Sequence, residues 1–234
     1  MQHLIYHHKQ KTSLTAEGQG EKSFRWLFHH SEDSLTSMVF SRLCYLPSSI
    51  FWNLLMRACR EPNFTLQPGK LLSYQFWPRW NAEGTVNLRY AEPDVFLRFE
   101  HFDLLVEAKK GDGQPLQNDA QQMKEMQSYY NVYAEDNKAM LFLAVGGLGY
   151  DHDKYDPLPL PGRHTPIPRL SCHWKHLHYE VFRHIQELQS NRDSIAAPMI
   201  HILWDIDMAF TLHDFFIGAL FETLPDYTIS HYTI

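Results

Sequence analysis

Two neighbouring apolar segments constrain this chain more than any other feature, because together they predict a β-hairpin. Residues 94–99 and 102–109 both alternate Val, Leu and Phe with occasional charged side chains, and only Glu100 and His101 separate them. Two strands joined by so short a loop pair antiparallel, and the loop length fixes which residues face each other. The sequence therefore predicts not only the hairpin but also its register.

Two acidic residues face each other in that register, namely Asp94 and Glu107. Directly opposed side chains on one sheet face lie about 5 Å apart at Cβ, and like charges placed so repel. A shared Mg²⁺ relieves the repulsion, because it binds carboxylate oxygens while keeping several waters. Side chains alternate along a strand, so Lys109 projects beside Glu107 while Ala108 turns into the core. The amine can orient or deprotonate a water that the metal acidifies.

The same residues carry a resemblance to a known family. Pro93-Asp94 opening one strand and Glu107-Ala108-Lys109 ending the next resemble the signature of the PD-(D/E)XK nuclease superfamily. The resemblance implies an α/β, restriction-endonuclease-like fold with an αβββαβ core. Its mixed central sheet is flanked by helices and followed by an extra C-terminal strand and helices. It also implies a catalytic aspartate, a metal-binding glutamate and a catalytic lysine at these positions.

Two further residues agree with the resemblance, which covers about residues 31–145. Members often carry a glutamate on the first core helix, where Glu32 stands; an ordinary acidic first-turn residue is the alternative. Many carry a glutamine on the helix after the lysine, where Gln121 stands; a capping box begun by Asn118 is the alternative. The expected metal ligands are Asp94, Glu107 and Glu32. The expected catalytic residues are Asp94, Glu107, Lys109, Glu32 and Gln121.

The activity that the resemblance implies is metal-dependent hydrolysis of phosphodiester bonds by an endonuclease, with DNA favoured over RNA. The expected cofactor is Mg²⁺, for which Mn²⁺ can substitute. Similar proteins act in restriction, phage defence or mobile-element processing, which suggests DNA as the partner and a homodimer or a subunit of a defence complex as the assembly. The alternative is a catalytically silent nuclease-fold subunit that binds nucleic acid or serves as a scaffold. A scaffold has no physical need for opposed carboxylates, so the enzyme is favoured.

Hydrophobic periodicity and turn residues predict the remaining elements. Residues 1–30 read as a loosely attached segment with a strand near 24–28, and 149–168 as a long loop. Ser31 is the expected N-cap of the first helix. Helices are expected over residues 31–46, 48–59, 118–133, 174–188 and 207–224. Strands are expected over residues 71–77, 85–89, 94–99, 102–109, 138–145 and 199–205.

Composition bounds the class of protein. With 234 residues and 44% hydrophobic residues, the chain is expected to form one domain, residues 1–234. A net charge of −6 argues against a globally basic nucleic-acid binder, although bound cations change the field at a carboxylate site. Three scattered cysteines, no apolar leader and no membrane-length apolar stretch lead us to expect a soluble cytoplasmic protein without a membrane partner.

A zinc site is the main rival to the carboxylate site. Cys172, His173, His176 and His178 lie within seven positions of one another in the sequence, which is the spacing of half a zinc site. The second close pair of ligands that a zinc site usually needs is missing. The sequence therefore favours Mg²⁺ at the hairpin over Zn²⁺ at the histidines.

Overall fold

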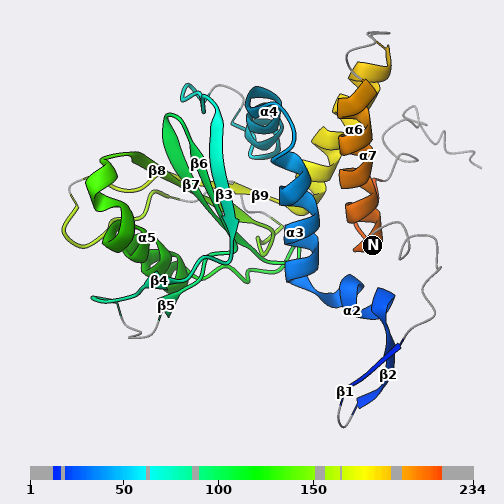
Figure 1. Ribbon diagram of the computed structural model, residues 1–234, viewed down its shortest axis with the longest axis horizontal. Helices are drawn as coiled ribbons and strands as arrows, with labels where there is room; N and C mark the ends of the chain where they lie inside the picture. The colour runs from blue at the N-terminus through cyan, green and yellow to red at the C-terminus, as the bar shows by residue number, and fades with distance from the viewer. Residues whose placement is uncertain are drawn as a thin grey trace, which may run out of the picture.

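A five-stranded mixed sheet lies at the centre of the protein (Figure 1). The computed structural model describes residues 13–16, 19–61, 64–85, 90–150, 156–163, 165–190 and 197–217. In spatial order the strands are β3 (Leu71–Phe76), β6 (Val95–Phe99), β7 (Phe102–Ala108), β8 (Ala139–Val145) and β9 (Arg169–Cys172). The pairs β3–β6 and β6–β7 are antiparallel, whereas β7–β8 and β8–β9 are parallel. The expected α/β class with a mixed sheet is confirmed.

Helices cover both faces of this sheet (Figure 1). One side carries α3 (Glu32–Leu43), α4 (Ser48–Ala58), α6 (Trp174–Ser190) and α7 (Ala197–Leu212), and the other carries α5 (Asp119–Tyr133). The short strands β4 (Trp80–Asn81) and β5 (Tyr90–Ala91) pack beside α5, which the 3-10 turn η1 (Ala134–Asp136) follows. The hairpin of β1 (Ser13–Ala16) and β2 (Gln19–Ser23), with α2 (Phe24–His30), projects away from the sheet.

Alternation along β7 explains why both faces of the sheet are covered. Leu104 and Val106 point into a core shared with α3, α4, α6 and α7, whereas Leu105 points into a core shared with α5. Every residue of β7 is buried. Because burying one such side chain stabilises the fold by about 1.5–3 kcal/mol, a slip of one residue would exchange the two faces and lose this packing.

The hairpin register is the predicted one. Val95 pairs with Val106 and Arg98 with Asp103. The second pair forms an ion pair across the hairpin, with Arg98 Nε lying 3.2 Å from Asp103 Oδ2. Asp103 is fully buried, and Lys138 Nζ lies 3.1 Å from its other oxygen. The Tyr129 hydroxyl donates a hydrogen bond to Asp103 over 3.0 Å, so this end of the hairpin is closed by a polar network.

Helix starts follow the capping residues of the sequence. Ser31 accepts a hydrogen bond from the backbone N–H of Ser34 over 3.1 Å, and Asn118 accepts from two N–H groups at the start of α5. Helix α3 ends at Leu43, three residues before the expected end at residue 46. It ends early because the chain turns there and the Pro47 carbonyl begins α4, where it accepts from the N–H of Phe51.

Two expected strands were wrong, and one strand was missed. Residues 24–28 belong to helix α2 and not to a strand. Residues 199–205 lie inside α7, which also takes the first part of the expected helix 207–224; residues 218–224 lie outside the described residues. The largely apolar run 199–205 suits a strand or a helix, and the buried Leu203 and the adjoining Ile206 are spaced by three as on a helix face. The missed strand is β9, over residues for which no element was expected.

The remaining differences concern loops. Strand β3 ends at Phe76 because Trp77 adopts a positive φ of 49°. Thr85 lies in a bend after β4, and residues 86–89 of the strand expected there are outside the described residues. The expected long loop before Pro168 is irregular where it is described, with isolated bridges from Gly149 to Gly113 and between Leu158 and Ile167. Within the described ranges, the helices are all too short or too polar to cross a membrane.

Candidate active site

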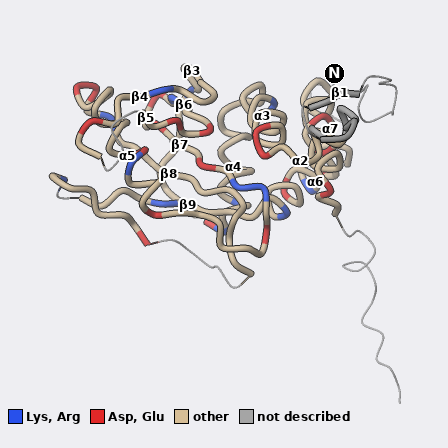
Figure 2. The backbone as a smooth tube through the Cα atoms, turned by 90° about the horizontal axis from the view of Figure 1, so that it is seen from below, with Lys and Arg blue, Asp and Glu red and all other residues tan. Residues whose placement is uncertain are grey.

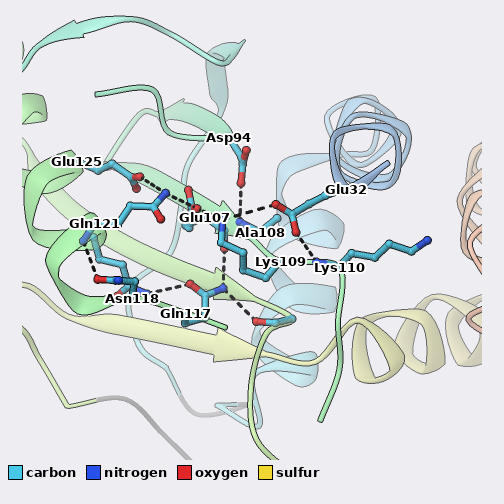
Figure 3. A network of polar contacts seen from close by, with 12 residues as sticks. Glu32, Asp94, Glu107, Ala108, Lys109, Lys110, Gln117, Asn118, Gln121 and Glu125 are labelled. Carbon is cyan, nitrogen blue, oxygen red and sulfur yellow. Dashed lines mark hydrogen bonds and ion pairs between the residues drawn. The ribbon is translucent and has the colours of Figure 1, made fainter. Parts of the chain in front are cut away.

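The hairpin end opposite the Arg98–Asp103 pair carries Asp94. Asp94 directly precedes β6, and its side-chain oxygen Oδ2 accepts a hydrogen bond from the backbone N–H of Ala108 over 2.8 Å (Figure 3). This bond continues the hairpin by one more position, so Asp94 lies next to Glu107, with which it interacts electrostatically. Only 9% of Asp94 is exposed. The two acids thus come together on the α5 side of the sheet, as the register predicted.

Lys109 follows directly after β7 and turns toward Glu107. Its ammonium Nζ lies 2.5 Å from Glu107 Oε1. Glu107 is 2% exposed, and its second oxygen, Oε2, is buried without a hydrogen-bond partner among the described residues. An unsatisfied buried carboxylate oxygen is unfavourable unless a donor or cation reaches it. The lysine therefore neutralises one side of the glutamate and leaves the other side open.

Glu32 joins the site from α3. Its Oε2 accepts a hydrogen bond from the backbone N–H of Lys110 over 2.7 Å, and its Oε1 lies 3.6 Å from the ammonium of Lys109. The side chain of Lys110 extends away from the acids (Figure 3). Glu32 is therefore more than an acidic first-turn residue, because it holds both the backbone and the ammonium at the end of β7.

Gln121 joins from α5. Its backbone N–H is capped by Asn118, but its side-chain amide donates to Glu107 Oε1 over 2.6 Å and to Glu125 Oε1 over 3.0 Å. The side chain thus turns to the acids and not back to the N-cap, and its catalytic role stays a prediction. All five residues expected in the site lie in one polar network (Figure 3).

Glu125 is a member of this network that the sequence analysis missed. It is 2% exposed, and its Oε2 has no hydrogen-bond partner among the described residues. It lies one helical turn after Gln121, so the two share a face of α5. The signal that could have identified it is an acidic residue four positions after the expected glutamine, on the same side of the helix as the buried Met126 and Tyr129.

Burial and like charge govern the electrostatics of the site. Burial and then the charge of Glu107 raise the pKa of Asp94 to about 7. Burial raises the pKa of Glu107, against the opposing effect of Lys109. Burial and then Glu107 raise the pKa of Glu125 well above its ordinary value. Burial lowers the pKa of Lys109, but Glu107 and Glu32 outweigh it, so the net shift is upward. The positive charge of Lys109 is therefore not enough to keep the pKa values of these buried carboxyl groups at their ordinary level.

A second set of contacts fixes the end of β7. Gln117 donates from Nε2 to the carbonyl of Gly146 over 3.0 Å and to that of Glu107 over 3.3 Å. The indole N–H of Trp174 donates to the Lys109 carbonyl over 2.9 Å. Gly146 has a positive φ of 63°, and a side chain there would collide with the Lys109 carbonyl and the Trp174 ring. The lysine is therefore positioned by residues far from it in the sequence.

The carboxylate oxygens of the site are the kind of ligand that a hard cation such as Mg²⁺ takes. In the described parts of the chain, no three His, Cys, Asp or Glu side chains are grouped so that they could hold a metal ion. Magnesium, however, is commonly bound by only one or two carboxylates, with waters and substrate phosphate completing its shell. The open Glu107 Oε2 and the acids with raised pKa values are the groups that such a cation would satisfy. The residues present therefore fit Mg²⁺.

The histidines of the rival zinc site do not converge. The His173 and His176 rings lie 5.0 Å apart, but His178 Nε2 lies 2.7 Å from Asp207 and the ring stacks on Phe210. His178 therefore joins α6 to α7 and does not point toward the other two. Packing between helices accounts for its position.

Comparison with known proteins adds similarity without an activity. No protein-family model matches the chain, and no solved structure matches it. A curated relative, the "Uncharacterized protein PM0110" of Pasteurella multocida, is 31% identical over 127 residues. The match covers 54% of this chain and 44% of that protein, so the chain spans less than half of the relative's length. The function has to be argued from the geometry of the site.

Proposed function

We propose that this protein is a divalent-cation-dependent phosphodiester hydrolase of the PD-(D/E)XK type that cuts DNA. One observation carries the proposal: the hydrogen bond of 2.8 Å from Ala108 N–H to Asp94, which sets a buried aspartate beside the Glu107–Lys109 ion pair. Packing gives no reason to bury these acids together, since burial and mutual repulsion raise the pKa of Asp94. Perturbed carboxyl groups that gather at one site are typical of catalytic centres.

The chain's own residues divide the work of hydrolysis. Asp94 and Glu107, with Glu32 at the edge of the cluster, are the groups to hold Mg²⁺ or Mn²⁺. The bound cation supplies an acidified water and neutralises phosphate charge. Lys109 directs its ammonium to the same place, where it stabilises negative charge while the water oxygen bonds to phosphorus, the P–O ester bond breaks and the leaving oxygen takes up the proton that the water gives up. Gln121 keeps the Glu107 carboxylate oriented through its bond of 2.6 Å.

Local groups have to attract the substrate in this proposal. Acidic and basic residues are interspersed along the described chain (Figure 2), and the net charge is −6. Long-range steering toward nucleic acid is therefore weak, and binding depends on the cation and on nearby donors. The wider proposal is a role in restriction, phage defence or mobile-element processing, with a homodimer cutting both strands of a duplex.

A second candidate function has one observation in its favour. The Lys109 ammonium lies 2.5 Å from Glu107 Oε1, so an ion pair already neutralises half of the glutamate that the cation needs. A catalytically silent subunit that binds nucleic acid or acts as a scaffold would be stable with this ion pair alone. The two candidates differ in whether a cation adds stability.

Cation-dependent stabilisation separates the two candidates. At ten times its dissociation constant, a cation that binds only the folded state stabilises it by about 1.4 kcal/mol, which raises Tm by about 3–6 °C for a chain of this size. We expect Mg²⁺ or Mn²⁺ to produce such a rise in the wild type and none in Asp94→Ala. Asp33→Ala, an exposed acid in the first turn of α3, is the matched control and should keep the rise.

Turnover is tested on supercoiled plasmid, linear duplex, single-stranded DNA and RNA, each with Mn²⁺ and with EDTA. We expect nicking of the plasmid with Mn²⁺, none with EDTA and none with Asp94→Ala. Cutting of RNA alone would move the substrate from DNA to RNA. If the protein cuts no substrate and its Tm does not rise with the cation, the silent subunit is favoured.

A further inference from the structure

A cavity of about 560 Å³ adjoins the candidate active site. It is bounded by the first two turns of α5, the turn after β4 and the segment that contains Pro161. Pockets that bind small ligands commonly have volumes of about 300–1,000 Å³, so the cavity has room for one nucleotide. Gln121 is part of its wall, and the same side chain donates to Glu107 over 2.6 Å. The cavity therefore opens beside the acids.

The polar lining of this cavity has unused hydrogen-bonding capacity. Asn118 uses its side-chain oxygen to cap α5, which leaves its amide N–H groups. Gln127 donates from Nε2 to Asn131 over 3.4 Å, which leaves its side-chain carbonyl. Within the described ranges, the Lys124 ammonium has no ion pair or hydrogen bond. Donors and acceptors thus lie along one side of the cavity, with a cation among them.

The combination of these groups suits a nucleotide more than a purely apolar ligand. Asn118 offers donors and Gln127 offers an acceptor, and together they can meet the polar atoms on the edges of a nucleobase. Met123 and Pro161 supply apolar surface in the same cavity, against which the face of a base can pack. Lys124 lies one turn from Gln121 and offers the positive charge that a phosphate needs.

We propose that this cavity holds one nucleotide of the substrate strand next to the bond that is cut, with its base read by Asn118 and Gln127 and its phosphate bound by Lys124. The position of this nucleotide beside the bond that is cut rests on the proposed function. The inference goes beyond that function because it assigns the choice of base to residues of α5 and its N-cap. Binding of a single nucleotide can be measured without cation or turnover, so its test is independent of hydrolysis.

The test is a titration of the full chain, labelled with ¹⁵N, in EDTA. The side-chain amide signals of Asn and Gln are followed while AMP, GMP, CMP or dTMP is added up to millimolar concentration. We expect at least one nucleotide to shift the Asn118 and Gln127 signals saturably. Ribose 5-phosphate, which has the phosphate without a base, should not reproduce these shifts.

Two variants and a control complete the experiment. Gln127→Ala should weaken the binding of the preferred nucleotide at least fivefold, and Lys124→Ala should weaken nucleotides more than the corresponding nucleosides. Gln75→Ala, on an exposed part of β3, should leave binding unchanged, and thermal denaturation confirms that each variant is folded. Absence of saturable shifts, equal shifts with ribose 5-phosphate, or unchanged binding in Gln127→Ala would each overturn the inference, even if the protein cuts DNA. Saturable binding without any cutting would support the cavity and refute the hydrolase.

Discussion

The carboxylate of Glu32 lies 3.6 Å from the ammonium of Lys109, although the two residues belong to different layers of the protein. The other carboxylate oxygen of Glu32 accepts a hydrogen bond from the backbone N–H of Lys110, the residue after Lys109. The ammonium therefore lies between Glu32 and Glu107, while the chain that carries it is held from α3. This arrangement gives the end of β7 a fixed position and makes the adjacent lysines unequal.

That inequality leads to the first prediction. Lys109→Ala should lower the rate of cutting by about 10²–10⁴-fold, the usual contribution of a positioned group that assists proton transfer or charge stabilisation. Lys110→Ala should change the rate much less, because its side chain extends away from the acids (Figure 3). Single-turnover nicking of a supercoiled plasmid measures both variants. Equal losses in the two variants would remove the special role of Lys109.

The second prediction concerns pH and the protein without cations. The pKa of Asp94 rises from 3.8 to about 7 on folding, so the folded state binds more protons than the unfolded state between these values. The free energy of unfolding in EDTA should therefore fall as pH rises from about 4 to about 7, by at most about 4 kcal/mol from this group. Asp94→Asn should make the slope shallower and Asp33→Asn should not. A slope unchanged in Asp94→Asn would show that Asp94 ionises normally.

The third prediction separates support of a catalytic group from catalysis itself. Gln121→Ala removes the donor that lies 2.6 Å from Glu107, and loss of such a supporting contact typically lowers metal affinity or activity about 10–100-fold. A positioning role predicts that a higher Mn²⁺ concentration recovers part of the rate, since Asp94 and Glu107 remain. The activity is measured as a function of Mn²⁺ concentration. A loss that no Mn²⁺ concentration reduces would contradict the positioning role.

The fourth prediction concerns stability at the other end of the hairpin. Asp103→Ala should destabilise the fold by about 3–5 kcal/mol, because it leaves Arg98 and Lys138 without their buried partner. Arg57→Ala, which removes a half-exposed pair with Glu187, should change stability by less than about 1 kcal/mol. Chemical denaturation measures both. Similar values for the two variants would mean that solvent screens Asp103 despite its burial.

Local rules were enough to predict the hairpin and the residues gathered around it. A two-residue connection left one favourable register, which set Val95 opposite Val106 and brought Asp94 to the end of β7. Capping residues likewise located the starts of α3 and α5. The arrival of Glu32 and Gln121 beside Glu107 was only implied by resemblance, because no local rule places α3 and α5 against the sheet.

Elements without a local rule were the ones missed. The run 199–205 is short and mostly apolar, so its periodicity did not distinguish a strand from the helix α7. Strand β9 is short, and it forms because β8 offers a parallel edge that only the folded sheet provides. Glu125 was not singled out, because its burial follows from the packing of α5 on the sheet.

The contact between Trp174 and the Lys109 carbonyl has a consequence for dividing the chain. Asp112, three residues after that lysine, also accepts hydrogen bonds from the N–H groups of Trp174 and Lys175 at the start of α6. A fragment that stops after β8 would keep every acid and the amine, yet lose the anchor that aims the amine. Residues in the last third of the chain, remote from any reacting atom, are therefore needed for the site to keep its shape.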